Sequence, residues 1–304
     1  MSASILVVGS VAFDSVKTPF GEAEEILGGS ATHFSVAASY FAPVRLVGVV
    51  GKDFGDKHLQ VFHKHKIDID GLTFAEGRTF RWAGEYNFDL NDRRTLDTQL
   101  NVFEKFDPVI PESYRASEYV FLGNIHPTLQ LSVLQQIKKP RLVACDTMNF
   151  WIEGQLDDLK LTLAHVDMLV INDAETRMLA GMPNLVKAAN AIMKMGPKTL
   201  IIKRGEYGVL MFHENSIFSA PAFPLEDVYD PTGAGDTFAG GFVGALAHAG
   251  EVTERTIRRA IIYGSVLASF NVEKFGVERT TDLKRHEIDE RFRQFKHLTH
   301  FEEL

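Results

Sequence analysis

Short apolar runs alternate with amphipathic stretches along the chain, a pattern typical of a parallel β-sheet whose strands are separated by helices. The runs rich enough in aliphatic residues to be strands buried on both faces are ILVVGS, VRLVGVVG, YVFLGN, RLVACD, DMLVIND and TLIIKRG. Apolar positions at helical spacing predict helices over 30–41, 129–137, 174–180, 186–195, 234–248 and 253–270. We therefore expect one α/β domain over residues 1–304, with a mostly parallel central sheet flanked by helices.

Two polar segments, 13–27 and 78–103, interrupt this pattern and lack helical periodicity. Between Phe80 and Leu90, apolar and polar residues alternate, and a period of two predicts a strand with one apolar face. LNDRR would then form a turn, and TLDTQLNVF would return as a second strand. One interpretation is a surface hairpin that covers the core. The other is a small β-sheet lid over a binding cleft, which would also pair with a second subunit in a homodimer.

Polar residues follow the predicted strands at the ends where open α/β sheets bind their ligands. These residues are Asp14, Asn124, Asp146, Asn172 and Lys203. Because the carboxyl ends of parallel strands meet at one end of the sheet, we expect a binding site among them.

The composition, with 45% hydrophobic and 24% charged residues in a chain of 304, is that of a globular protein. A formal net charge of -8 argues against general binding to nucleic acid or to an anionic membrane, because both need a basic surface. The single cysteine, Cys145, lies in an apolar run and is expected to be a buried structural thiol. No apolar stretch is long enough to span a membrane and no basic leader is present, so we expect a cytoplasmic protein.

The stretch DPTGAGDTFAGGF, residues 230–242, places a glycine cluster at the start of a predicted helix. A helix start carries N–H groups without acceptors and a partial positive charge, so the amides of Gly233, Ala234 and Gly235 can surround an anion. Asp236 would repel a bound anion, and its presence is better explained if it accepts a proton from a hydroxyl that attacks phosphorus. The alternative is an ordinary N-capped helix whose aspartate favours the dipole.

Five motifs, in order and spacing, resemble the ribokinase-type carbohydrate kinase family, also called the PfkB family. They are GGSATHFSVAAS, VVGKDFG, NDAE, KRGEYG and DPTGAGDTFAGGF. The resemblance covers nearly the whole chain and implies a ribokinase-like fold, with ATP and Mg²⁺ as cofactors. It also implies that Asp236 is the catalytic base and that the amides of residues 233–235 form its anion hole. The P-loop pattern and the dinucleotide-binding glycine pattern are both absent from the sequence.

The resemblance further implies where the nucleotide and the metal bind. Asn172 and Glu175 match an Asn-x-x-Glu motif that organises phosphate and the water shell of Mg²⁺. Lys203, Gly205 and Gly208 match the loop that lies along the nucleotide phosphates.

For the acceptor, the resemblance implies a site at Asp14, Gly28, Gly29 and His33. His33 departs from the family pattern, which usually has asparagine at this position, so its consequence for the acceptor stays open. Asp230 and Thr232 match positions near a monovalent-cation site in some members, and the sequence leaves a requirement for K⁺ open.

Three hypotheses remain open: an ATP-dependent small-molecule kinase, a non-catalytic ligand-binding relative, and an unrelated α/β nucleotide-binding enzyme. Asp236 favours the kinase, because a binding module has no use for a base at the transfer point. The acceptor stays open among sugars, sugar phosphates and nucleosides. The aromatic residues Trp82, Tyr86 and Phe88 could stack on a base or a sugar ring, or could pack against the other strand of the lid. Arg93 and Arg94 could either meet a phosphorylated sugar or be solvated at a turn.

Overall fold

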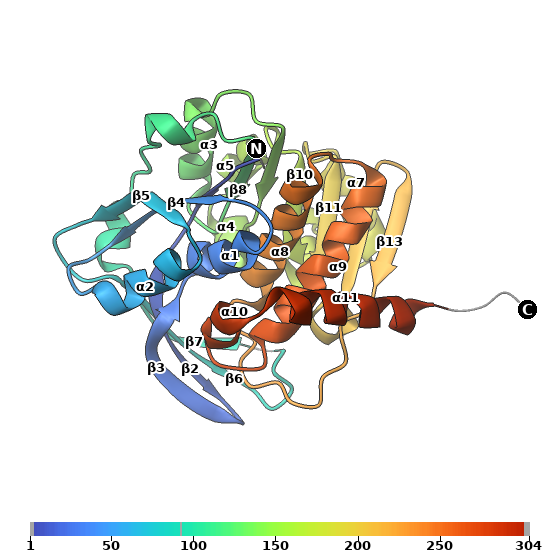
Figure 1. Cartoon of the computed structure of the whole chain (residues 1–304). Coiled ribbons are helices and arrows are strands. Elements are labelled where there is room, and N and C mark those ends of the chain that lie inside the picture. The colour runs from blue at the N-terminus through green and yellow to red at the C-terminus, as the bar shows by residue number, and fades with distance from the viewer. Residues whose placement is uncertain (1–2, 92, 301–304) are drawn as a thin grey trace, which may run out of the picture.

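The central sheet has nine strands in the order β13-β12-β11-β10-β9-β8-β1-β4-β5 (Figure 1). The structure is a computed structural model that describes residues 3–91 and 93–300. All neighbouring pairs from β11 to β5 are parallel, and β12 and β13 add an antiparallel edge. The strands are β1 (Ile5–Val8), β4 (Val44–Val50), β5 (Asp68–Phe74), β8 (Tyr119–Leu122), β9 (Leu142–Cys145), β10 (Met168–Asn172), β11 (Thr199–Lys203), β12 (Val209–His213) and β13 (Ser216–Ala220).

The six strands predicted from apolar runs are confirmed, and they form the continuous middle of this sheet from β11 to β4. The sequence did not predict β5, β12 and β13, which lie at the two edges. In β5 and β13, exposed positions interrupt the buried ones, so no continuous apolar run identifies them. Strand β12 does contain an apolar run, VLMF, which the sequence analysis missed.

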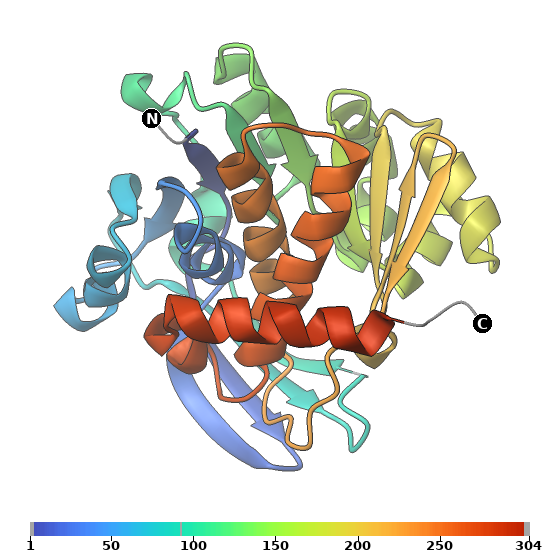
Figure 2. The ribbon, with the colours of Figure 1, turned by 45° about the vertical axis from the view of Figure 1, so that its right-hand side comes forward.

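Helices cover both faces of the sheet, and successive strand residues point to opposite layers. In β1, Ile5 and Val7 belong to the core beneath α1, α8, α9 and α11, whereas Leu6 and Val8 belong to the core beneath α3 to α7. Figure 2 shows α11 lying across α9 on the first face. The helices are α1 (Ser30–Ser39), α2 (Asp56–Lys64), α3 (Pro127–Gln136), α4 (Asn149–Gly154), α5 (Leu156–Leu163), α6 (Asp173–Ala180), α7 (Leu185–Met193), α8 (Ala234–Ala249), α9 (Glu254–Asn271), α10 (Glu278–Asp282) and α11 (Arg285–Thr299).

All six predicted helices are confirmed with ends shifted by at most two residues, and five further helices were not predicted. The longest of these, α11, buries only Ile288 and Phe295, and α2 buries only Phe62. So few apolar anchors give too weak a periodic signal. No helix in the described part of the chain is both long and apolar enough to cross a bilayer.

A second sheet of four strands, in the order β3-β2-β6-β7, is formed by the two polar segments (Figure 1). Its strands are β2 (Ala12–Thr18), β3 (Gly21–Gly28), β6 (Phe80–Tyr86) and β7 (Arg93–Gln99). The predicted strand to Leu90 was too long, because β6 ends at Tyr86 and the chain turns, with Leu90 at a φ of 59°. The returning strand begins at Arg93, which the sequence had placed in the turn. Below we call these four strands the small sheet.

Candidate active site

Helix α8 begins with no side chain to cap it. Its N-cap, Gly233, has φ 72° and ψ 0°, and Asp236 lies in the first turn. The N–H of Ala234 donates to Pro231 O at 3.2 Å, whereas the N–H groups of Gly235 and Asp236 have no acceptor among the described residues. Two amides and one carboxylate thus meet at the positive end of a 16-residue helix.

Lys203 lies beside this helix start. It ends β11 and pairs in register with Asn172, which ends β10. Its Nζ is 4.0 Å from Oδ2 of Asp146, the residue after β9, and a Cβ added at Gly235 would lie 2.8 Å from the same Nζ. The ends of three adjacent parallel strands therefore bring an ammonium group and a carboxylate to the first turn of α8.

Asn172 and Glu175 form a reciprocal capping box at the start of α6. The Glu175 N–H donates to Asn172 Oδ1 at 2.7 Å, and the Asn172 N–H donates to Glu175 Oε2 at 2.8 Å. This arrangement holds the Glu175 carboxylate in place through one oxygen and leaves Oε1 without a hydrogen bond among the described residues.

Burial of several acids dominates the electrostatics of this region. Burial raises the pKa of Asp236, while Lys203 and Arg93 oppose the rise and Glu175 adds to it. Burial likewise raises the pKa of Glu175 and of Asp146, again against the charge of Lys203. Burial would lower the pKa of Lys203, but the surrounding carboxylates outweigh it and raise the pKa. The cluster therefore keeps a charged lysine among acids that hold protons more tightly than usual.

Asp14 lies in β2 and faces the start of α1. Its Oδ2 accepts the Gly29 N–H at 3.4 Å, and a Cβ at Gly28 would lie 1.9 Å from the same oxygen, so only glycine allows this approach. Burial raises the pKa of Asp14 to about 7, helped by Asp230 and Asp236, whereas the Gly29 N–H and Arg93 lower it. The proximity of two other aspartates places Asp14 in the same acidic region as the start of α8.

His33 lies beneath the start of α8. It is 2% exposed, and a Cβ added at Gly233 would lie 2.3 Å from its ring. Its Nδ1 is 3.1 Å from Asn271 Oδ1, and the Asn271 Nδ2 donates to Thr232 O at 2.8 Å. Asn271 must therefore offer its oxygen to the ring, which places the proton of a neutral His33 on Nδ1. Nε2 is left buried without a partner among the described residues.

Asp230 is completely buried, and both of its oxygens accept backbone N–H groups. Thr232 N donates to Oδ1 at 2.8 Å and Gly276 N donates to Oδ2 at 3.0 Å. In the described part of the chain, no group of three or more His, Cys, Asp or Glu side chains is arranged to hold a metal ion. Any ion at this end of the sheet would therefore depend on backbone, water or substrate oxygens.

The small sheet contacts both the loop before α8 and the loop after β11. Thr232 Oγ1 donates to the Tyr86 hydroxyl at 3.2 Å, so β6 is joined to the loop that precedes α8. In the β6–β7 turn, Asn91 Nδ2 is 3.4 Å from Glu206, and a Cβ at Gly205 would lie 3.1 Å from Asn91 Oδ1. The small sheet thus extends from the loop before α8 to the loop after Lys203.

Two contributors to this region escaped the sequence analysis: Asn91, which it placed only in a turn, and Asn271. Asn271 closes α9, far along the chain from every motif, and no local pattern identifies it. Ser30, the first residue of α1, contacts the loop after β1, where its Oγ is 3.2 Å from Ser10 Oγ. Cys145 is buried, as predicted, and burial raises the pKa of its thiol.

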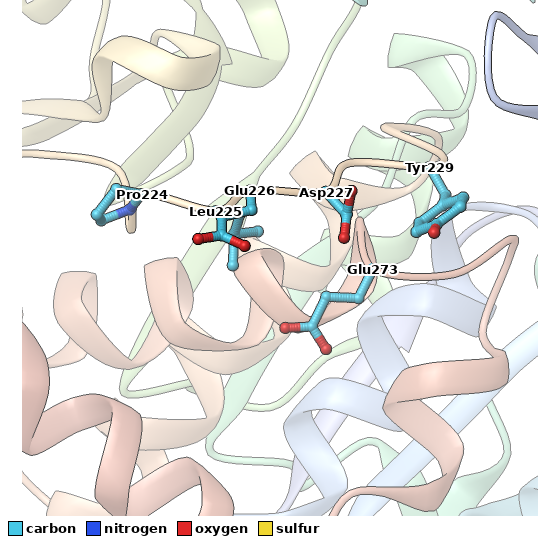
Figure 3. A pocket seen from close by; sticks show the side chains of 6 residues that line it. All are labelled: Pro224, Leu225, Glu226, Asp227, Tyr229 and Glu273. Carbon is cyan, nitrogen blue, oxygen red and sulfur yellow. The ribbon is translucent and has the colours of Figure 1, made fainter.

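A surface pocket of about 410 Å³ contains none of the predicted site residues. It is lined by Pro224, Leu225, Glu226, Asp227, Tyr229 and Glu273 (Figure 3). Glu273 already pairs with Arg279 at 2.9 Å and with Arg291 at 2.7 Å. This pocket is therefore separate from the group of residues around Asp236.

The sequence model of the pfkB family carbohydrate kinases matches residues 2–283. The chain belongs to this family. It is 30% identical over 260 residues to the cytidine kinase of Thermococcus kodakarensis, an alignment that covers 84% of this chain and 92% of that protein. The match extends through both sheets and all five motifs, so the protein is a kinase of the pfkB family.

Solved structures share the fold at lower identity. The nucleoside kinase of Methanocaldococcus jannaschii, described as an archaeal member of the ribokinase family, superposes with a TM-score of 0.78 at 21% identity, over 97% of this chain and 99% of that one. The fructokinase of Vibrio cholerae O395, bound to fructose, ADP and calcium ion, gives 0.78 at 18% identity, over 96% and 99%. These likenesses confirm the predicted ribokinase-like α/β fold.

Proposed function

We propose that the protein transfers the γ-phosphoryl group of ATP to a hydroxyl of a small sugar-like acceptor, with Asp236 as the general base. The observation that carries this proposal is the start of α8, where the half-buried carboxylate of Asp236 lies beside Lys203 and beside two N–H groups that have no acceptor among the described residues. A base next to a group of anion-binding donors is what attack of a hydroxyl on phosphorus requires.

In the proposed reaction, the acceptor hydroxyl forms a bond to the γ-phosphorus while the bond between this phosphorus and the ADP oxygen breaks. The hydroxyl proton passes to Asp236, and ADP leaves with the electron pair of the broken bond. Gly235 and Asp236 donate N–H groups to the oxygens of the transferred group, and Lys203 offsets the charge of the nucleotide phosphates. Because burial raises the pKa of Asp236, its carboxylate holds a transferred proton better than an exposed aspartate would.

Mg²⁺ would neutralise charge on the phosphate oxygens when it is bound. Glu175 fits a role in its water shell, because one carboxylate oxygen is fixed by the capping box and the other is free of hydrogen bonds among the described residues. Asp230 and Thr232 fit a structural role for a monovalent cation less directly, since both Asp230 oxygens already accept N–H groups.

Two acceptor classes compete, simple sugars and nucleosides. Asp14 is the acceptor-side group in both cases, because its buried carboxyl lies near Asp236 and is held by Gly29. A nucleoside is the second candidate, favoured by the 30% identity to a cytidine kinase over 84% of this chain. The ring of Trp82, half-buried in the small sheet, supplies an apolar surface for a base or for a sugar.

The test is a screen of sugars, sugar phosphates and nucleosides for ligand-dependent ADP release with Mg²⁺ and ATP, in which Asp236→Asn serves as the blank. We expect one class to raise ADP release well above the acceptor-free rate. Binding of acceptors, seen as thermal shifts, without ADP release for any of them would favour a non-catalytic relative and contradict the proposal.

We also propose that two copies associate through their small sheets. Strand β7 is exposed along its whole length at the edge of the sheet, where Leu96 is 53% exposed, and Phe88 in the adjoining turn is 84% exposed. Exposed apolar groups on an open sheet edge favour pairing with a partner. Sedimentation should show a dimer that Phe88→Ser with Leu96→Ser weakens, and a monomer at all concentrations would contradict this.

A further inference from the structure

We propose that Arg93, on strand β7 of the small sheet, is a catalytic residue that binds the phosphoryl group during its transfer. This inference rests on the proposed function, and it adds a cation on the side of the site opposite Lys203. Arg93 lies outside the five sequence motifs. The assignment depends on which face of the small sheet the residue occupies, on what anchors that sheet, and on the charges around it.

The strand register places Arg93 on the face that meets the site. Arg93 is the cross-strand partner of Tyr86, and directly opposed residues in a β-ladder point to the same face. Tyr86 is buried and accepts a hydrogen bond from Thr232, the residue before Gly233. Arg93 therefore projects on the same side as Tyr86, toward the start of α8.

The neighbouring arginine points the other way. Arg94 is the partner of Glu85, and its Nη2 is 2.7 Å from Glu85 Oε2 on the opposite face. Residues adjacent along a strand alternate between faces, so Arg93 and Arg94 have different surroundings despite their shared chemistry. This difference makes Arg94 the matched control for Arg93.

Two hydrogen bonds join the strand and turn next to Arg93 to the loops around the site. Strand β6 is joined to Thr232 through Tyr86, and the β6–β7 turn reaches Glu206 through Asn91. Arg93 follows Asn91 by two residues and is the cross-strand partner of Tyr86. Its guanidinium also lies over the ring of Trp82, with Cζ 5.1 Å from the ring centroid, which limits the positions it can adopt.

The charge of Arg93 acts on three carboxyl groups of the site. Among residues 3–91 and 93–300, Arg93 forms no ion pair within 4.0 Å, unlike Arg94. Burial raises the pKa of Asp14, Glu175 and Asp236, and the charge of Arg93 opposes the rise in all three. The charge of Arg93 therefore acts on the carboxyl group proposed as the base and on those proposed for the acceptor and for the metal.

The chemistry of arginine suits this place. Its planar fork of N–H donors matches two oxygens of a phosphoryl group, and it stays charged at any working pH. A donor aimed where charge develops lowers the barrier more than it strengthens binding of the ground state. We therefore expect Arg93 to affect kcat far more than the KM of either substrate.

The experiment compares wild-type protein, Arg93→Gln, Arg93→Lys and Arg94→Gln, using the acceptor found in the screen. In Arg93→Gln we expect kcat to fall on the order of 10²-fold while both KM values change by less than about threefold. Arg93→Lys should recover part of the loss, because it restores charge without the bidentate fork. In parallel, ADP with aluminium fluoride and acceptor, a mimic of the planar transferred group, should bind to wild type and to Arg94→Gln, but more weakly to Arg93→Gln.

Three outcomes would overturn the assignment. Equal kcat values for Arg93→Gln and Arg94→Gln would show that Arg93 does not contact the transferred group. A raised acceptor KM at unchanged kcat would place Arg93 on the acceptor instead. If wild type itself releases no ADP with any acceptor, the proposed function fails and this inference fails with it, whereas an active wild type with an indifferent Arg93→Gln removes only the inference.

Discussion

Helices α8 and α9 pack against each other, yet they begin in opposite ways. Helix α9 starts at Thr253, whose hydroxyl accepts the Thr256 N–H while the Thr256 hydroxyl accepts the Thr253 N–H. Helix α8 starts at Gly233 with a positive φ and with no side chain to satisfy its first amides. The side-chain cap that begins α9 is missing from α8, where the Ala234 N–H donates to the backbone oxygen of Pro231 instead.

The difference separates a structural helix start from one suited to a ligand. A side-chain cap at α8 would occupy the space that an anion needs, and Gly233 keeps that space open at a cost in local stability. Helix α1 also begins at a glycine with a positive φ, Gly29 at 91°, but the N–H groups of Ser30 and Ala31 donate to Ser10. We therefore expect substitutions at the start of α8 to affect activity, and those at the start of α9 to affect only stability.

The largest effect is expected for Asp236→Asn, which keeps the shape of the first turn of α8 and removes the base. We expect kcat to fall on the order of 10²-fold or more. Nucleotide affinity should remain close to that of wild type. The melting temperature near pH 7 should stay equal or rise, because burial disfavours the charged carboxylate. Steady-state kinetics measure kcat and the KM for ATP, and thermal melts measure the melting temperature. A folded variant with wild-type turnover would rule out Asp236 as the base.

Gly233→Ala should damage the same helix start by steric means. The new Cβ would lie 2.3 Å from the His33 ring, and alanine at φ 72° is strained. We expect a loss of about 2 kcal/mol in the free energy of unfolding, together with lower kcat. Denaturant unfolding measures the first.

The double variant with His33→Asn separates the two causes. The smaller side chain relieves the contact with the ring and leaves the backbone strain, so part of the loss should return. A fully additive double variant would show that the ring contact does not matter.

The α1 side can be tested through pH. Burial raises the pKa of Asp14 to about 7, above its value in the unfolded chain, so the unfolded state loses this proton first. The stability tied to this group is complete below about pH 4 and is lost as pH rises through about 7. Asp14→Asn should therefore raise the melting temperature relative to wild type more at pH 8 than at pH 4.

The control is Asp89→Asn, which changes an exposed aspartate in the β6–β7 turn. It should shift the melting temperature equally at both pH values. If Asp14→Asn behaves in the same way, the carboxyl of Asp14 is not buried as the structure has it.

The sequence predicted those parts of the molecule that are encoded locally. The six buried strands follow from unbroken apolar runs, and the start of α8 follows from a glycine cluster ahead of an apolar helix. Asn172 and Lys203 could be expected to meet because each ends a strand of one parallel sheet, and the register joins them directly.

Other parts depend on contacts between distant segments and leave no local signal. Asn271 reaches His33 across 238 positions of sequence, and Tyr86 reaches Thr232 across 146. Arg93 looked like a turn residue because the alternation continued to Leu90, and only the observed end of β6 at Tyr86 places it in a strand facing the site. Helix α11 was missed because a helix held by two buried side chains has almost no apolar period.

The smallest effect is expected at α9. Thr253→Ala removes the hydroxyl that accepts the Thr256 N–H, at an exposed helix start far from the predicted site residues. Loss of such a cap costs about 1 kcal/mol, which corresponds to roughly 2–4 °C in melting temperature for a chain of this size. Because no ligand completes this helix start, kcat and both KM values should equal those of wild type. Thr253→Ser, which keeps the cap, should restore the melting temperature. A fall in kcat for Thr253→Ala at unchanged nucleotide affinity would break the comparison, since it would show that a capped helix start also contributes to the chemistry.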